Sequence, residues 1–160
     1  ARGSRAGRGG AAVPVSGTPA PRAVLDTNVL LDLWLFDDPS VRPLRAAIEA
    51  GSLRALRSGD CDAEFAEVLG REGFGLDDAA RAEMLTRWAR CSEPIADVAP
   101  APITCTDRDD QKFLDAAFSA RADWLLTRDK ALLRLARRAV AAGLHIARPS
   151  AAMTYDRARS

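Results

Sequence analysis

The sequence has few residues of the kinds that hold zinc or form disulfide frameworks. Its 160 residues include a single histidine, His145, and three cysteines. The cysteines (Cys61, Cys91 and Cys105) are odd in number, widely spaced and without a Cys-x-x-Cys pair. We therefore expect neither a zinc site nor a fold held together by disulfides.

Long apolar runs are also lacking. No stretch approaches the roughly 18 consecutive apolar residues of a membrane-spanning helix, although hydrophobic residues make up 48% of the chain. That proportion, with 28% charged residues, is ordinary for one globular domain that buries a single core. We expect a cytoplasmic protein that does not contact a membrane.

The beginning of the chain lacks acids and has almost nothing to bury. Residues 1–21 are rich in Arg, Gly and Pro, which predicts a disordered tail. The first residue is not methionine and Gly3-Ser4 follows, so a cloning remnant stays open as the origin of this stretch. We expect the folded domain over residues 22–150 and a C-terminal tail or short helix over 151–160.

Outside that tail the chain has no excess of positive charge. Four arginines and no acid fall within residues 1–22, so against a net charge of +1 for the whole chain the rest carries −3. An acidic body is a poor nucleic-acid binder unless its acids gather in one place and bind a metal ion. The position of the acids therefore decides the interpretation.

A short apolar run, Ala23-Val24-Leu25, ends abruptly in Asp26 and two further polar residues. The run lacks polar alternation, which predicts a central strand buried on both faces of a parallel sheet. Ligands of such sheets bind beyond the carboxyl ends of the strands, where Asp26 would lie. The alternative is that Asp26, Thr27 or Asn28 only caps the helix that follows.

The same pattern recurs about a hundred residues later. Trp124-Leu125-Leu126 is an apolar run followed by Thr127 and Asp129, and a helix is expected from Lys130 to Gly143. A second strand end thus supplies a second aspartate.

Two more acids lie on predicted helices. Glu64 shares the edge of an inward stripe formed by Cys61, Phe65, Val68 and Leu69, whereas Glu67 is rotated away. Asp110 precedes Leu114 by four residues and falls on the buried stripe of its helix. Helical spacing points Asp107 and Asp109 elsewhere. The alternative is that these aspartates simply suit the positive end of the helix dipole.

The remaining predicted elements alternate between helices and strands. They are a helix over 41–50, a strand over 53–58 with one solvated face, a helix over 59–69, a helix from 76 with Met84, Leu85 and Trp88 inward, a short strand over 95–98 in a proline-rich connection, and a strand over 144–146. Such alternation predicts an α/β fold with a parallel sheet.

Parallel strands share one carboxyl edge, so the four acids should meet there. Carboxylates held close together repel one another, and the cluster persists only if protons or cations neutralise it. Oxygen ligands without histidine or cysteine select Mg²⁺ or Mn²⁺. These ions support the hydrolysis of phosphodiester bonds.

Four segments in this order resemble a PIN domain. They are VLDTNV at 24–29, EFAEVL at 64–69, DRDDQKFL at 107–114 and ADWLLTRDK at 122–130. The similarity covers about residues 22–150 and is greatest to the bacterial group described as toxin components of toxin-antitoxin systems. The resemblance implies a three-layer α/β/α fold and a metal-dependent ribonuclease.

The resemblance also implies roles for individual residues. The metal-binding acids would be Asp26, Glu64, Asp110 and Asp129, and the supporting polar residues Asn28 and Thr127. The spacing after Asp110 is longer than the family often has. Asp107, Asp109 or Asp115 could therefore share or take its role, with Asp115 the first substitute. Arg128 and Lys130 either hold phosphate or are solvated charges at a helix start.

The function implied is that of an Mg²⁺- or Mn²⁺-dependent endoribonuclease acting on single-stranded or looped RNA. Few basic residues are available to grip a duplex. A cognate antitoxin would be a partner, and a homodimer stays open. A catalytically weak PIN scaffold that binds RNA or regulates is the alternative, although all four acids are present. A doubly wound nucleotide-binding protein is disfavoured because no glycine-rich phosphate loop follows a strand.

Overall fold

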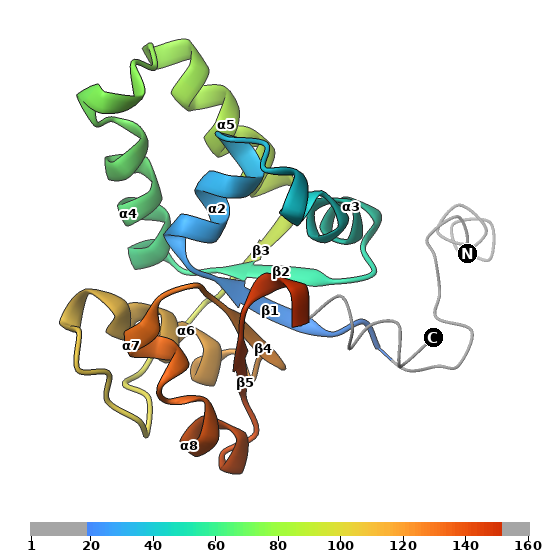
Figure 1. Cartoon of the computed structure of the whole chain (residues 1–160), viewed down its shortest axis with the longest axis vertical. Helices are drawn as coiled ribbons and strands as arrows, with labels where there is room; N and C mark the ends of the chain where they lie inside the picture. Colours follow the sequence, from blue (N-terminus) through green and yellow to red (C-terminus); the bar gives the residue numbers. More distant parts are fainter. Residues whose placement is uncertain (1–18, 152–160) are drawn as a thin grey trace, which may run out of the picture.

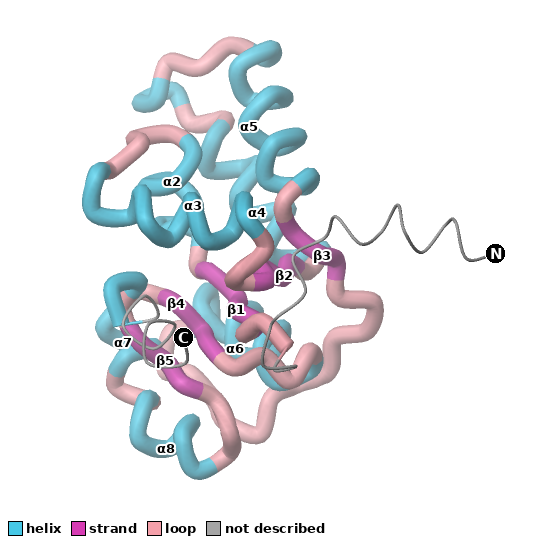
Figure 2. Tube along the Cα trace, turned by 90° about the vertical axis from the view of Figure 1, so that its right-hand side faces the viewer, coloured by secondary structure: helices cyan, strands magenta, loops and turns pink. Residues whose placement is uncertain are grey.

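The computed structural model describes residues 19–151 and is built around a five-stranded, wholly parallel sheet (Figures 1 and 2). The strands lie in the order β3-β2-β1-β4-β5. Their bounds are β1 Arg22–Leu25, β2 Arg54–Arg57, β3 Ser92–Pro94, β4 Trp124–Leu126 and β5 His145–Ala147. The α-helices are α2 Thr27–Trp34, α3 Arg42–Ala50, α4 Gly59–Leu69, α5 Asp78–Arg90, α6 Gln111–Ser119, α7 Lys130–Leu133 and α8 Ala136–Ala141. The 3₁₀ turns are η1 Pro39–Val41, η2 Glu72–Phe74 and η3 Arg108–Asp110.

Helices cover both faces of the sheet, which confirms the expected α/β/α layers. Figure 1 shows α2, α3, α4 and α5 above the sheet and α6, α7 and α8 below it. Two buried clusters correspond to these layers. Ala23 and Leu25 of β1 belong to the upper cluster and Val24 to the lower one, because successive side chains of a strand point to opposite faces.

The two apolar runs lie side by side at the middle of the sheet, as the sequence predicted. Val24 pairs with Leu125 on one side and with Leu56 on the other. All three residues of β4 are buried. This adjacency places the residues that follow β1 beside those that follow β4.

The predictions for β2 and β3 need correction. Ala55 and Leu56 are both buried on opposite faces of β2, so neither face is solvated. The reason is that helical layers cover both faces of the sheet, so Ala55 packs in the upper cluster and Leu56 in the lower one. The third strand lies at Ser92–Pro94 and not at 95–98. Its pairing extends only to Ile95, whose N–H donates to the Arg57 carbonyl at 2.8 Å.

The helix expected from Lys130 to Gly143 is in fact two short helices, α7 and α8. The Leu135 N–H bonds to the Leu132 carbonyl at 2.9 Å, and this tighter turn changes the helix direction. As a result Ala139 faces the core, while Val140 is 53% exposed and does not pack there as predicted.

Both predicted tails lie mostly outside the described residues, which exclude 1–18 and 152–160. A helical turn begins at Pro149, close to the predicted start of the C-terminal segment. Within residues 19–151, every helix is too short or too polar to cross a membrane.

Candidate metal centre

Asp26 lies at the carboxyl end of β1 and is only 3% exposed. Its backbone N–H continues the pairing with β4 by donating to the Leu126 carbonyl at 3.1 Å. Its Oδ1 accepts a hydrogen bond from the Val29 N–H at 3.0 Å and so caps α2. The capping interpretation is therefore correct, and it does not exclude a role in the site, because Asp26 also lines a pocket.

Thr127 joins the two strand ends. Its hydroxyl donates to Oδ2 of Asp26 and accepts from the Asp129 N–H at 2.9 Å. Asp129 in turn caps α7, with its Oδ1 accepting from the Ala131 N–H at 2.8 Å. The completely buried threonine thus fixes the relative position of two carboxylates that are about a hundred residues apart in sequence.

Asp110 lies at the start of α6 and completes a compact group of acids. One carboxylate oxygen from each of Asp107, Asp110 and Asp129 lies within 4.8 Å of the other two. Oδ2 of Asp110 is buried and lacks a hydrogen-bond partner among the described residues. Burial, and then the negative charges of Asp129 and Asp107, raise the pKa of Asp110 to about 7.

The ionised form of Asp26 is disfavoured for similar reasons. Burial raises the pKa of its carboxyl group, and the charge of Asp129 raises it further, while the hydrogen bonds from Thr127 and Val29 act in the opposite direction. Burial and like charge both disfavour the ionised form. A divalent cation would relieve both effects and would satisfy the orphaned oxygen of Asp110. The donor set consists only of carboxylate oxygens, which suits Mg²⁺ or Mn²⁺.

Glu64 lies in the same pocket but is already paired. Its Oε1 accepts from the Lys112 ammonium at 2.7 Å, and its Oε2 accepts from the Thr27 hydroxyl. Lys112 also donates to the Asp109 carbonyl at 2.5 Å. The Glu64 carboxylate is therefore held at the edge of the acidic group by a cation from α6.

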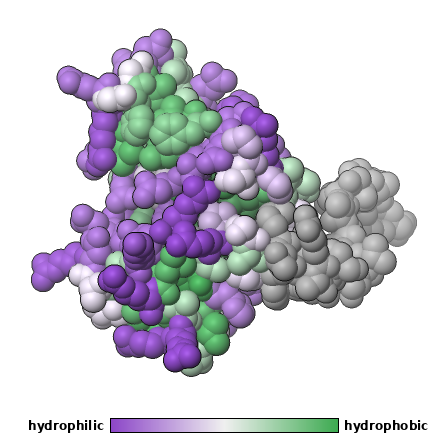
Figure 3. All heavy atoms as spheres, viewed as in Figure 1, coloured by the Kyte–Doolittle hydropathy of each residue, from purple (hydrophilic) through white to green (hydrophobic). Residues whose placement is uncertain are grey.

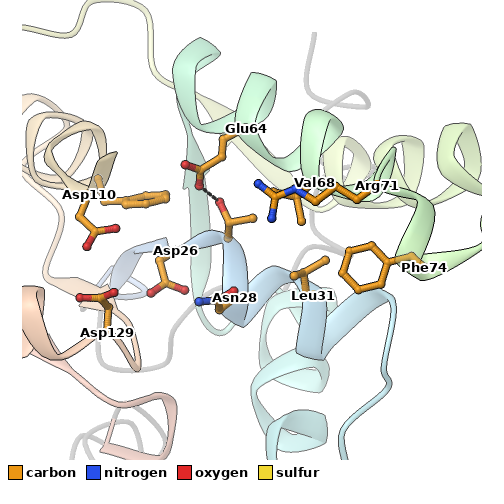
Figure 4. Close-up of a pocket in the computed structure, with 11 residues that line it drawn as sticks. Asp26, Asn28, Leu31, Glu64, Val68, Arg71, Phe74, Asp110 and Asp129 are labelled. Carbon is orange, nitrogen blue, oxygen red and sulfur yellow. Dashed lines mark hydrogen bonds between the residues drawn. The ribbon is translucent and has the colours of Figure 1, made fainter. Parts of the chain in front are cut away.

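The four predicted acids do come together in one pocket of about 290 Å³ (Figure 4). Figure 4 shows Asp26, Asp110 and Asp129 turned toward one another, with Glu64 above them on α4. The pocket is lined by Asp26, Thr27, Asn28, Leu31, Glu64, Val68, Arg71, Phe74, Asp110, Phe113 and Asp129. Asn28 is exposed and lines the same pocket.

The expectation that Asp107 points elsewhere is wrong, since it belongs to the acidic group. Its position was calculated with α-helical spacing, whereas residues 108–110 form the 3₁₀ turn η3. The substitute residue Asp115 does not reach the pocket. Its Oδ1 accepts from the Ala101 N–H at 2.8 Å and from Nε2 of Gln111 at 3.0 Å, and so holds the proline-rich connection.

The two predicted phosphate-binding residues are not among those that line the pocket. Arg128 is engaged elsewhere, because its Nη1 lies 2.8 Å from Oδ2 of Asp32 and its Nη2 donates to the Ser40 hydroxyl. Lys130 is exposed at the first residue of α7.

Sequence reasoning overlooked Arg71 and Lys112. Arg71 follows Glu64 by seven residues, with Val68 between them, so the helical spacing that selected Glu64 could also have found it. Lys112 carried no such signal. It meets Glu64 across 48 residues of sequence, through the packing of α4 against α6.

Residues 22–131 match the family described as PIN domain, and the chain belongs to that family. The match includes all four predicted acids and both strand ends. PIN domains are nuclease-type domains that generally depend on divalent metal ions. A comparison with curated proteins gave no match.

Proposed function

We propose that the protein is an Mg²⁺- or Mn²⁺-dependent endoribonuclease that hydrolyses phosphodiester bonds in single-stranded or looped RNA. The observation that carries the proposal is the acidic group at the carboxyl edge of the sheet. Three carboxylates lie within 4.8 Å of one another, and one buried oxygen of Asp110 has no partner among the described residues. A cation bound among these acids would supply that oxygen with a partner.

Asp110 and Asp129 are the ligands that the geometry favours most, with Asp107 at the exposed side of the group and Asp26 at its buried side. A divalent cation held by these acids polarises a phosphate group and makes water more acidic. Asp26 is kept in place by Thr127 and Val29, so its orientation does not have to be set when substrate arrives.

Glu64 has a different role from the other three acids in this proposal. Because Lys112 neutralises it, Glu64 sets the edge of the pocket and ties α4 to α6. Asn28 offers an uncharged amide on the same side of the pocket. Unpaired RNA is the preferred substrate because the pocket has too few cations to grip a duplex.

The test is cleavage of a labelled RNA pool by the purified protein in Mn²⁺, Mg²⁺ or EDTA. Asp26→Asn and Asp129→Asn should each be nearly inactive, because the charge on the phosphate oxygens in the transition state would lose its counter-ion. Glu83→Gln is the control, since Glu83 is exposed on α5 and is not among the residues that line the pocket. Cleavage that survives EDTA, or that persists at full rate in Asp26→Asn, contradicts the proposal.

We propose further that the nuclease acts in the cytoplasm as the toxin of a toxin-antitoxin pair, with a cognate antitoxin protein as its partner. This part of the proposal is supported by the resemblance of the four motifs to that bacterial group. Expression of the wild-type chain should arrest bacterial growth, and the Asp129→Asn variant should not. Relief of the arrest by the adjacent gene would identify the antitoxin, and growth unaffected by the active enzyme would argue against the toxin role.

A further inference from the structure

The pocket continues beyond the acids into a part with different chemistry. This part, the distal half, is formed by Asn28 and Leu31 of α2, Val68 of α4, and Arg71 and Phe74 just after α4. Figure 4 shows Phe74 at the end away from Asp110 and Asp129, beyond Leu31. No acid lines the distal half within the described chain, so it is not an extension of the metal centre.

Arg71 is the one cation among the described residues that line the pocket. In Figure 4 its side chain runs back past Val68, and the guanidinium points toward the acids. The side chain is 63% exposed, and its ion pair with Glu67 spans 3.8 Å between two exposed groups. Ion pairs between exposed side chains contribute little to the free energy of folding. The guanidinium can therefore exchange Glu67 for a phosphate, whose oxygens its planar donors match.

Phe74 and Phe36 form an aromatic surface next to Arg71. Their ring centroids are 5.9 Å apart at an interplanar angle of 65°. Phe36 is 55% exposed, one of the few large hydrophobic side chains with that exposure in the described chain. Figure 3 shows hydrophobic residues gathered on the upper part of the molecule in this view. The exposed ring of Phe36 and the half-buried ring of Phe74, beside a guanidinium, are a combination suited to binding unpaired nucleotides.

We propose that the distal half is the binding site for the RNA strand next to the cleaved bond. Arg71 binds a backbone phosphate, and Phe74, supported by Phe36, stacks on an unpaired base. This inference rests on the proposed ribonuclease function and names how its substrate is held. Because every base has a face that can stack, the site selects unpaired RNA over duplex with little regard to sequence.

The electrostatics of the pocket support this assignment. The acids attract the metal but repel the phosphates on either side of the one being cut. A strand that crosses the acidic edge therefore needs a cation at a distance from the metal, and Arg71 is the lining residue that supplies it. A protein partner on this face would not require Arg71 to point back toward the acids.

The experiment measures binding of a fluorescein-labelled, unpaired RNA of about 12 nucleotides. Ca²⁺ replaces Mn²⁺ so that the acids stay neutralised by an oxygen-seeking cation while cleavage is suppressed. Arg71→Gln should weaken binding about tenfold and reduce the slope of log affinity against log salt by about 0.7, the value for one phosphate of a single strand. Arg138→Gln, the same change at an exposed position on α8, should alter neither quantity.

Phe74→Leu should weaken binding about tenfold without changing the salt slope, because stacking is lost and no charge is removed. Phe74 also packs against the core, so the melting temperature is measured in parallel. Phe74→Trp should restore binding, and Phe36→Leu should give a smaller loss. A merely structural role for Phe74 would lower stability and leave the RNA affinity of the folded protein unchanged.

Two results separate this inference from the proposed function. In the first, Asp26→Asn is inactive while Arg71→Gln and Phe74→Leu bind RNA with wild-type affinity and salt slope. The distal half is then not the binding site for the RNA strand, but the proposed nuclease function is retained. If Phe36→Leu and Phe74→Leu instead dissociate a dimer and leave RNA binding intact, the face joins two copies, which overturns the inference. Cleavage at the full wild-type rate by Asp26→Asn would contradict the proposed function itself, independently of the results for Arg71→Gln.

Discussion

The two ends of the central sheet differ in the charges that surround their ionisable side chains. Where the strands begin, Arg54 donates two hydrogen bonds to Glu93, at 2.8 and 2.6 Å, and the Arg22 N–H donates to Asp123 at 2.8 Å. At the carboxyl end, Asp110 and its acidic neighbours face one another. Accordingly the pKa of Glu93 is lowered by Arg54, whereas the pKa of Asp110 is raised to about 7.

The difference separates charges that serve the fold from charges that serve a ligand. Folding alone favours the arrangement at the beginning of the strands, since Arg54 and Glu93 carry opposite charges and are paired there. A group of mutually repelling carboxylates, of which Asp110 and Asp129 are half-buried, costs stability and is kept where a positively charged ligand compensates for it. The predictions below change one end of the sheet at a time.

The largest effect is expected on cleavage when Asp110 is changed to Asn. The substitution keeps the shape of the side chain but removes a charge from the acidic group, and activity should fall by on the order of a hundredfold or more. Asp115→Asn, on the same helix but outside the pocket, should stay within a few-fold of wild type. Initial rates in Mn²⁺ decide between them, and the reverse order of the two variants would mean that Asp115 is the ligand.

The second effect concerns stabilisation by metal. A cation that binds only the folded protein should raise its free energy of unfolding by about 2.7 kcal/mol when free Mn²⁺ exceeds the dissociation constant about 100-fold. In Asp26→Asn this increment should shrink, while the metal-free variant should equal or exceed the metal-free wild type in stability because one buried charge is gone. Thermal melts with and without Mn²⁺ measure both quantities, and equal increments in the two proteins would locate the ion elsewhere.

The third effect is a pH dependence in EDTA. The pKa of Asp110 is about 7 in the folded protein, well above the ordinary value of an aspartate, so the folded state binds this proton more tightly than the unfolded chain does. The contribution of Asp110 to stability is therefore greatest near pH 4 and declines as pH rises to about 7. Metal-free wild type should lose more stability between pH 5 and pH 8 than metal-free Asp110→Asn. Identical pH profiles of the melting temperature would contradict the assignment.

The smallest effect is expected at the other end of the sheet. Arg54→Gln removes the pair with Glu93, but both side chains are more than 40% exposed, so the free energy of unfolding should fall by only about 0.5 kcal/mol. Cleavage should not change, since the pair is remote from the pocket. A large loss of activity in a folded Arg54→Gln protein would contradict the inference that charges at this end of the sheet serve only the fold.

The sequence predicted the elements whose patterns are local and strong. The strands at Val24 and Leu125 and the inward stripe of α4 around Phe65 are confirmed, because continuous apolar runs and helical stripes follow directly from burial. The prediction of a half-solvated strand over 53–58 was wrong. Both of its faces are buried by helices that come from other parts of the chain, and its own residues do not indicate those helices.

The sequence predicted which acids meet in the candidate site, but not the contacts that hold each of them. Asp26, Glu64, Asp110 and Asp129 share a pocket because parallel strands have a common carboxyl edge. The sequence did not reveal that Glu64 is paired with Lys112, since that contact depends on how two helices pack. The position of Asp107 was missed because a 3₁₀ turn rotates successive residues by a different angle from an α-helix.

Thr127 bridges carboxylates contributed by opposite ends of the chain, and this has a consequence for how the protein is made. The Asp26 to Thr127 hydrogen bond joins residues 101 positions apart. At a synthesis rate of about 5–20 residues per second, Asp26 exists for roughly 5–20 s before Thr127 and Asp129 are added. During that interval the nascent chain contains the first strand and its aspartate but lacks the second half of the acidic group. The domain thus emerges from the ribosome without its complete acidic group, which forms only when β4 pairs with β1.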